Sequence, residues 1–245
     1  MASSAVEPGL TAGEKVAARS RAVTLVALGL LAALAWGYLL SGAAMASGTI
    51  AAGIAMWFVM MVAMMVPGAA PTILLYARVH RHSADTSPPT AAFLAGYLVC
   101  WLGFAVVAAL LQAALGDGGV LDPMMGMLRS ARVAGGLLIG AGLYQWTPVK
   151  DACLSECRTP GGFLARHFRP GAPGAYRLGL IHGLYCVGCC WLLMALLFVA
   201  GVMNLALIAA LTLLVAAEKL LPYGRLLARF GGMLLIVAGV ALVLR

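Results

Sequence analysis

The sequence predicts an all-α polytopic membrane protein. Of its 245 residues, 63% are hydrophobic and only 10% are charged, and the mean hydropathy is +1.01. A soluble domain has roughly 45–50% apolar and about 25% charged residues, so this chain falls far outside that class. Backbone groups inside a bilayer must bond to one another, and long apolar runs are therefore expected to be helices.

Seven apolar segments are candidate membrane spans by length and composition. They cover residues 22–40, 50–79, 91–115, 133–149, 176–203, 205–220 and 230–244. The second segment contains Pro67 and Pro71. Because proline removes a backbone donor, we expect this helix to be kinked or broken there. The fifth and sixth segments are almost continuous, so six spans are an alternative.

The distribution of Lys and Arg indicates the orientation. If seven spans start from a cytoplasmic N-terminus, only Arg129, Arg132 and Arg245 among the basic residues fall outside. This bias follows the positive-inside rule, and it explains the net charge of +8 without a nucleic-acid partner. We expect a disordered tail at residues 1–18. Residues 19–245 should form one transmembrane domain, with a cytoplasmic Cys-containing loop at 150–175.

Five of the six cysteines lie in two clusters: Cys153 and Cys157, then Cys186, Cys189 and Cys190. In a helix, the second cluster shares one face with His182, because residues three and four apart are neighbours. Thiolates are soft ligands that suit Cu(I), Zn(II) or iron–sulfur clusters. A disulfide in the first cluster is disfavoured because the cytoplasm is reducing. We therefore predict that both clusters and His182 bind metal, whereas packing is the expected role of Cys100.

A methionine-rich stretch, MWFVMMVAMMVPGAAP, occupies residues 56–71. At helical spacing, Met60 and Met64 fall on one row, and Met61 and Met65 on the next. Thioethers are neutral soft ligands, suited to Cu(I) and less costly in a bilayer than carboxylates. Packing alone explains such a stripe too. Counted from the span ends, however, it lies at a depth similar to that of the second cysteine cluster, so we add these four methionines to the predicted metal ligands.

Other sequence features point to simpler roles. Glu218 and Lys219 at the inner end of the sixth segment are expected to form an interfacial ion pair. The sequence contains no Walker loop, dinucleotide fingerprint or serine nucleophile elbow. We assign no catalytic residue, and we expect a protein that is not an enzyme.

The chain resembles a bacterial family of predicted metal-binding integral membrane proteins, a domain family of unknown function. The resemblance is carried by MWFVMMVAMMVPGAAP at 56–71, KDACLSECRTPGGF at 150–163, HGLYCVGCCWLLM at 182–194 and AAEKLLP at 216–222. It implies a polytopic inner-membrane protein that binds metal, and it supplies no substrate or reaction.

The favoured hypothesis is a protein that handles Cu(I), by transport or by delivery to a partner protein; zinc and other soft metals stay open. The alternative is a membrane thiol–disulfide oxidoreductase, since Cys186 and Cys189 have CxxC spacing and the loop offers a second pair. That alternative gives the methionines no role. Haem bound by His182 and a methionine, or a packing subunit with incidental sulfur, are further possibilities. Direction of movement, energy coupling and oligomeric state do not follow from the sequence.

Overall fold

The computed structural model describes residues 12–42, 49–80, 89–122 and 124–244. Within these residues, all regular secondary-structure elements are helices, and the β-structure consists of one isolated bridge between Leu121 and Leu128. The predicted all-α class is therefore confirmed. The helices are α1 (Ala12–Leu40), α2 (Ile50–His80), α3 (Pro89–Asp117), α4 (Ala131–Tyr144), α5 (Pro148–Arg158), α6 (Pro160–His167), α7 (Gly171–Ala195), α8 (Leu197–Ala200), α9 (Leu205–Leu220) and α10 (Gly224–Val243).

Five stretches of the described chain are long and apolar enough to cross a membrane: α1, α2, α3, α7 continued through α8, and α10. The predicted membrane protein is confirmed at this level. Helices α4 and α9 have 14 and 16 residues, which at 1.5 Å per residue is roughly 21–24 Å, against a hydrocarbon core of about 30 Å. Seven spans and the cytoplasmic N-terminus therefore stay predictions.

Helix α2 is continuous through both of its prolines. It runs from Ile50 to His80 with Pro67 and Pro71 inside it. Of the two expected outcomes, a break does not occur, and a kink at these residues stays a prediction. Helices packed among other helices tolerate proline because neighbouring groups compensate for the lost backbone bond. Here Gly68, between the prolines, faces the side chain of Lys219, whose Cδ would lie 3.2 Å from a Cβ at that position.

Two other boundaries differ from the sequence prediction. The expected loop at 150–175 contains the short helices α5 and α6, both of which begin with a proline in the first turn. Residues 12–18, expected to be disordered, belong to α1. Residues 1–11 lie outside the described part of the chain, so a disordered tail there stays a prediction, as does the single domain over 19–245.

Glycines allow helices α3 and α7 to pack with their backbones in contact. A Cβ at Gly179 of α7 would collide with the carbonyl of Phe93 in α3, and a Cβ at Gly96 would collide with the carbonyl of Tyr176. Small residues permit this close approach in membrane helix pairs. The packing fixes the face of α7 that points into the bundle, and the three cysteines of the second cluster lie on that face.

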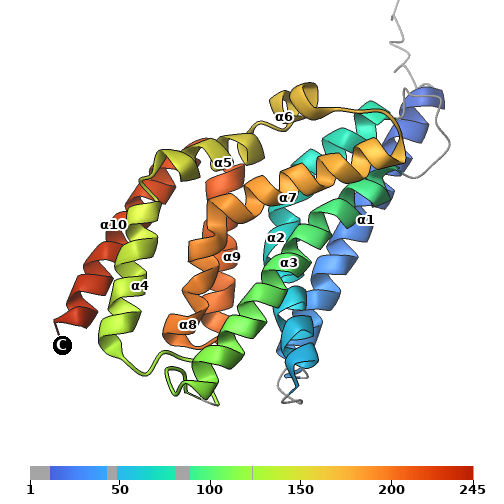
Figure 1. The fold of residues 1–245 in the computed structure, drawn as a ribbon. Helices are drawn as coiled ribbons and strands as arrows, with labels where there is room; N and C mark the ends of the chain where they lie inside the picture. Colours follow the sequence, from blue (N-terminus) through green and yellow to red (C-terminus); the bar gives the residue numbers. More distant parts are fainter. Residues whose placement is uncertain (1–11, 43–48, 81–88, 123, 245) are drawn as a thin grey trace, which may run out of the picture.

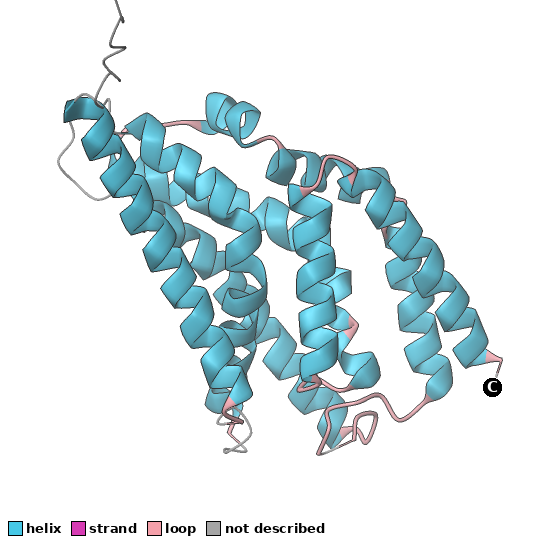
Figure 2. Ribbon diagram, turned by 180° about the vertical axis from the view of Figure 1, so that it is seen from behind, coloured by secondary structure: helices cyan, strands magenta, loops and turns pink. Residues whose placement is uncertain are grey.

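The chain passes between two ends of the bundle. In Figure 1, α5 and α6 lie across the upper end, and the start of α1 lies at the same end. The turn between α3 and α4 and the C-terminal end of α10 lie at the opposite end, as both views show (Figures 1 and 2). The first cysteine cluster lies on α5 and the second on α7.

Candidate metal centre

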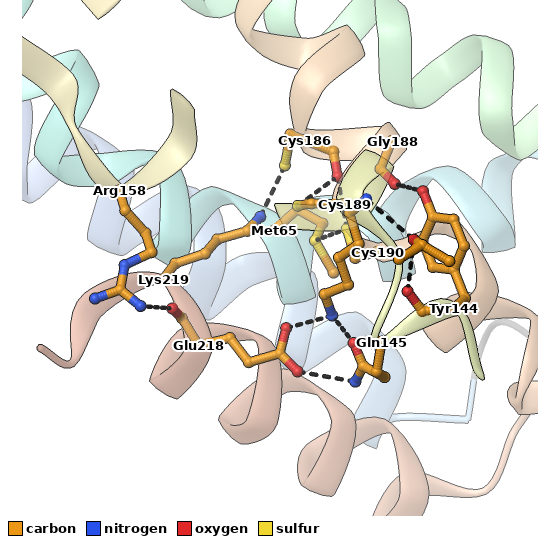
Figure 3. Close-up of polar contacts among 12 residues, drawn as sticks. Met65, Tyr144, Gln145, Arg158, Cys186, Gly188, Cys189, Cys190, Glu218 and Lys219 are labelled. Atoms are coloured by element: carbon orange, nitrogen blue, oxygen red, sulfur yellow. Dashed lines mark hydrogen bonds and ion pairs between the residues drawn. The ribbon is translucent and has the colours of Figure 1, made fainter. Parts of the chain in front are cut away.

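The second cysteine cluster is buried in the interior of the bundle. Cys186, Cys189 and Cys190 are each only 1% exposed. They lie on successive turns of α7, where the thiols of Cys189 and Cys190 donate to the carbonyl of Cys186 at 3.1 and 2.7 Å. The Sγ of Cys190 is 3.7 Å from the Sδ of Met65 in α2, so a thiol and a thioether from two predicted motifs are in contact (Figure 3).

Helix α5 brings the first cysteine cluster to the second. The pKa of the Cys157 thiol is held well above its usual value, first by hydrogen bonds with Cys186 and Cys189 and then by burial. Cys153 lies beside the same helix: a Cβ at Gly188 would be 2.8 Å from its Sγ. Burial is also the main reason that the pKa of the Cys153 thiol is raised. The glycine within Cys-Val-Gly-Cys is thus what lets α5 approach α7.

Lys219 contributes a positive charge to the thiol cluster. Its Nζ donates to the Sγ of Cys186 at 2.9 Å (Figure 3). The hydroxyl of Tyr97 lies 3.1 Å from the same sulfur. No ion pair joins Lys219 to a carboxylate in the part of the chain that the structure describes. A buried charge needs an opposite charge beside it, and the sulfur of Cys186 as a thiolate is the group placed to provide it.

A second buried lysine is paired in the ordinary way. Lys150 donates to the carboxylate of Glu218 at 2.7 Å, with side-chain exposures of 0% and 2%, and it also bonds to Gln145. The amide of Gln145 in turn donates to Glu218 at 3.0 Å. We expected Glu218 and Lys219 to form an interfacial pair. This prediction is wrong, because both side chains are buried and each has a different partner.

Arg158, the last residue of α5, fixes that helix to the end of α9. Its guanidinium donates to the carbonyls of Leu221 and Pro222 at 2.8 and 2.7 Å, and to that of Glu218 at 3.4 Å. A cation at these carbonyls satisfies acceptors that the end of a helix leaves unpaired. The arrangement places α5 over Lys219 and the thiols.

His182 lies one turn before Cys186 but points into an aromatic environment. Its ring centroid is 5.0 Å from that of Phe163 and 5.7 Å from that of Tyr97. The side chain is 1% exposed, and its Nδ1 has no hydrogen-bond partner among the described residues. The polar contacts of the thiol cluster described above do not include it.

The remaining sulfur residues are placed as follows. Met60, Met61 and Met64 are buried in the hydrophobic core, and the thiol contacts described above reach only Met65 of the predicted methionines. Cys100 donates to the carbonyl of Leu180 at 3.2 Å, in keeping with its expected packing role. The structure thus brings together both cysteine clusters and Met65. The contacts described above do not include His182, Met60, Met61 or Met64, which are buried in the same bundle.

The donor set is rich in sulfur but does not enclose an ion. Within the described residues, no three His, Cys, Asp or Glu side chains are grouped closely enough to hold a metal. The contacts present are thiol to thiol, thiol to thioether and ammonium to sulfur. Thiols and thioethers are soft ligands and fit Cu(I) better than Mg²⁺ or Ca²⁺.

Two residues at the thiols, Tyr97 and Lys219, were not among the predicted site residues. Tyr97 gave no signal, because an aromatic residue in an apolar helix is ordinary. Lys219 did give one: an ionisable residue inside a transmembrane segment indicates a functional site. Because Lys219 lies at the predicted inner end of the sixth segment, we assigned it to an ion pair at the membrane interface instead.

The described helices include five long enough and apolar enough to cross a membrane, and the bundle encloses buried thiols in contact with a thioether. The chain belongs to the PpoB2 family, described as copper chaperones: the family model matches residues 54–242, which include every residue of the site. The family supports the association with copper and the resemblance to a metal-binding family. No curated protein and no solved structure matches the chain.

Proposed function

We propose that this protein binds Cu(I) within the cytoplasmic membrane and exchanges it with a partner protein, by delivery or by transport. The observation that carries the proposal is the meeting of sulfur atoms from three helices: Cys157 of α5, the three cysteines of α7, and Met65 of α2. Thiolates and thioethers select Cu(I). The family description names the same metal.

Charge balance supports a monovalent ion. Cu(I) held by two thiolates carries one negative charge, and Lys219 beside Cys186 supplies one positive charge. The Lys150–Glu218 pair is neutral by itself, so a copper bis-thiolate with Lys219 leaves the buried site neutral. A divalent ion with the same ligands would leave one uncompensated positive charge, which is costly away from water.

The α5 helix offers a place for copper to enter. Cys153 is half-buried and borders Gly188 of α7, whereas Cys157, four residues later, contacts the buried thiols. Ligands that are close together without enclosing the ion favour transfer from one sulfur to the next over storage. In this proposal, Cys153 receives the ion at the cytoplasmic end, and Cys157 passes it to the α7 cysteines.

Metal content tests the proposal. The detergent-purified protein, loaded with Cu(I) under reducing conditions and then desalted, should retain stoichiometric copper by mass spectrometry. The Cys186→Ser/Cys189→Ser/Cys190→Ser variant should retain none. Cys100→Ser is the matched control, since Cys100 bonds to a backbone carbonyl outside the cluster, and it should retain copper as the wild type does. No copper in the wild type after loading would overturn the proposal.

Thiol–disulfide exchange is a second candidate because the Cys157 thiol interacts with the thiols of Cys186 and Cys189. All six cysteines are free thiols in the structure. A reversible disulfide between Cys157 and an α7 cysteine, in a protein that fails to retain copper, would favour this candidate. Exchange proceeds by attack of a thiolate on a disulfide and gives Met65 no role, so Met65→Leu would leave the redox cycle unchanged.

A further inference from the structure

A second group of methionines lies at the end of the bundle opposite the thiols. Met124, Met125 and Met127 occur within four residues of the turn between α3 and α4 and are 88%, 55% and 37% exposed. The group plays no part in the site described above.

Hydrogen bonds within the turn fix the backbone that carries these methionines. The carboxylate of Asp122 accepts from the backbone N–H groups of Met124 and Met125 at 3.0 and 2.8 Å. The N–H of Asp122 donates to the carbonyl of Met127 at 2.7 Å, and that of Gly126 donates to the carbonyl of Asp122 at 2.9 Å. Gly126 has φ of +59°, which favours glycine there. The three thioethers thus extend from one closed turn.

The turn is also attached to the helices behind it. Val202 donates to the carbonyl of Met125 at 3.1 Å, and Leu128 donates to that of Phe198 at 2.8 Å. These bonds join the turn to the segment that connects α7 and α9. The methionine group therefore has a fixed position on the bundle.

Behind the turn begins the buried methionine row of α2. A Cβ at Gly126 would lie 3.3 Å from the amide nitrogen of Gln112, and the oxygen of Gln112 accepts from Trp57 at 2.6 Å. Trp57 is the neighbour of Met56, the first of five methionines that end at Met65 against Cys190. From Met56 to Met65 the helix rises by roughly 14 Å. The methionine row of α2 thus begins near the turn and ends at the thiol of Cys190.

We propose that Met124, Met125 and Met127 form a second and weaker Cu(I) site at the end of the bundle opposite the thiols. The inference rests on the proposed function and extends it by naming where copper would leave or enter at that end. Thioethers without thiolates are soft but neutral ligands, so they favour Cu(I) over Zn(II) and hold it less tightly than thiolates do. Their exposure leaves room for the ligands of a partner.

Copper binding by the full-length protein in detergent tests this site. Cu(I) is titrated against a competing chelator under reducing conditions, for the wild type and for Met124→Leu/Met125→Leu/Met127→Leu. Loss of a residue that only contacts a metal ligand costs about 10–100-fold in metal affinity. Loss of the ligands themselves should therefore weaken binding of the second, weakly held Cu(I) by at least this factor. The tightly held copper should stay. Met233→Leu is the matched control, because Met233 is 46% exposed on α10, and it should bind as the wild type does.

Oxidation of the methionines gives an independent measurement. Ag(I) replaces Cu(I) here because it is soft and redox-stable, and hydrogen peroxide converts free thioethers to sulfoxides that peptide mass spectrometry locates. At a free Ag(I) concentration about ten times the Kd, only about a tenth of the sites are free. Oxidation of the three loop methionines should therefore slow about tenfold. Met233 in the same sample should oxidise at an unchanged rate.

The outcomes separate this inference from the proposed function. Protection of the three methionines in the Cys186→Ser/Cys189→Ser/Cys190→Ser variant would support the loop site, whether or not the thiols bind copper. Equal copper binding by the leucine variant and the wild type, or no protection by Ag(I), would overturn it. Leucine keeps the apolar character of the turn, so methionines that only contact lipid would give that negative result.

Discussion

At the residue scale, two buried lysines balance two different negative groups. Lys150 is paired with Glu218 in the ordinary way, whereas Lys219 faces the sulfur of Cys186. The first pair is complete without a ligand. The second gives the thiol cluster a fixed positive charge next to the sulfur that we propose binds copper. The two lysines therefore predict different consequences when they are replaced.

Lys219→Met should weaken copper binding while the protein still folds. The substitution keeps an apolar side chain of similar length against Gly68 but removes the charge that balances a copper bis-thiolate. We expect the apparent Cu(I) affinity to fall about 10–100-fold, as it does when other groups that contact metal ligands are lost. Competition with a chelator measures it. Arg177→Met removes a charge from an exposed position of α7 and is the matched control; equal affinities for the two variants would contradict the role of Lys219.

Glu218→Gln should destabilise the protein strongly, because it leaves Lys150 charged and buried. Removing one partner of a buried ion pair costs about 3–5 kcal/mol. Removing both partners in Lys150→Met/Glu218→Gln should cost less than the single change. Thermal unfolding in detergent provides the comparison. Glu156→Gln breaks a pair whose arginine, Arg166, is 54% exposed, and a pair of that kind contributes about 0–1 kcal/mol. If Glu218→Gln is as stable as Glu156→Gln, the buried Lys150–Glu218 pair does not stabilise the protein as we propose.

At the element scale, the short helix α5 completes the site. Its cysteines reach α7 only because Gly188 has no side chain, and Arg158 fixes its end to the carbonyls that follow α9. Thr147 begins the helix by accepting from the N–H of Lys150 at 3.2 Å. The position of α5 thus decides whether Cys157 contacts the buried thiols.

Gly188→Ala should therefore separate α5 from α7. The added methyl group would lie 2.8 Å from the sulfur of Cys153, so either that side chain or the helix has to move. Overpacking of this kind costs about 1–3 kcal/mol. We expect Cys157, now only 6% exposed, to react faster with a maleimide, and copper retention to fall. In Gly136→Ala the new methyl group meets nothing within 4 Å; the same labelling rate in both variants would sink the explanation.

At the scale of the whole molecule, the two ends of the bundle differ in chemistry. Helices α5 and α6 cover one end (Figure 1), and they contain Cys153, Cys157, Lys150, Arg158 and Arg166. The turn with the exposed methionines lies at the other end (Figure 1). A protein that moves copper across the membrane needs such a pair of unlike sites. The proposed orientation places the thiol end in the reducing cytoplasm, where thiolates stay free to bind metal.

Labelling of single added cysteines tests that orientation. Ala152→Cys lies on the exposed side of α5, and Arg129→Cys lies next to the methionine turn. In intact cells whose outer barrier has been made permeable, a membrane-impermeant maleimide should label the Arg129→Cys variant. It should label Ala152→Cys only after the inner membrane is opened. The wild type, with its half-buried Cys153, gives the background, and the reverse pattern would invert the proposed topology.

The sequence by itself determined the helical membrane class and the supply of soft ligands. Both follow from local properties: composition sets the solvent that the chain prefers, and residues three or four apart share a helix face in any fold. The family resemblance and the choice of copper followed from the same motifs. Helix ends were less well predicted, because α5 and α6 are short and polar enough to look like a loop.

Only the tertiary structure decided which of those ligands meet. The Sδ of Met65 lies 3.7 Å from the Sγ of Cys190 because the approach of α2 to α7 places that turn of the helix beside the cluster. Lys219 reached Cys186 from a helix that the motifs did not connect to the site. Periodicity fixes the faces of one helix, but the depth and partner of each residue depend on how glycines let neighbouring helices pack. The site is therefore a property of the bundle, and its ingredients are a property of the chain.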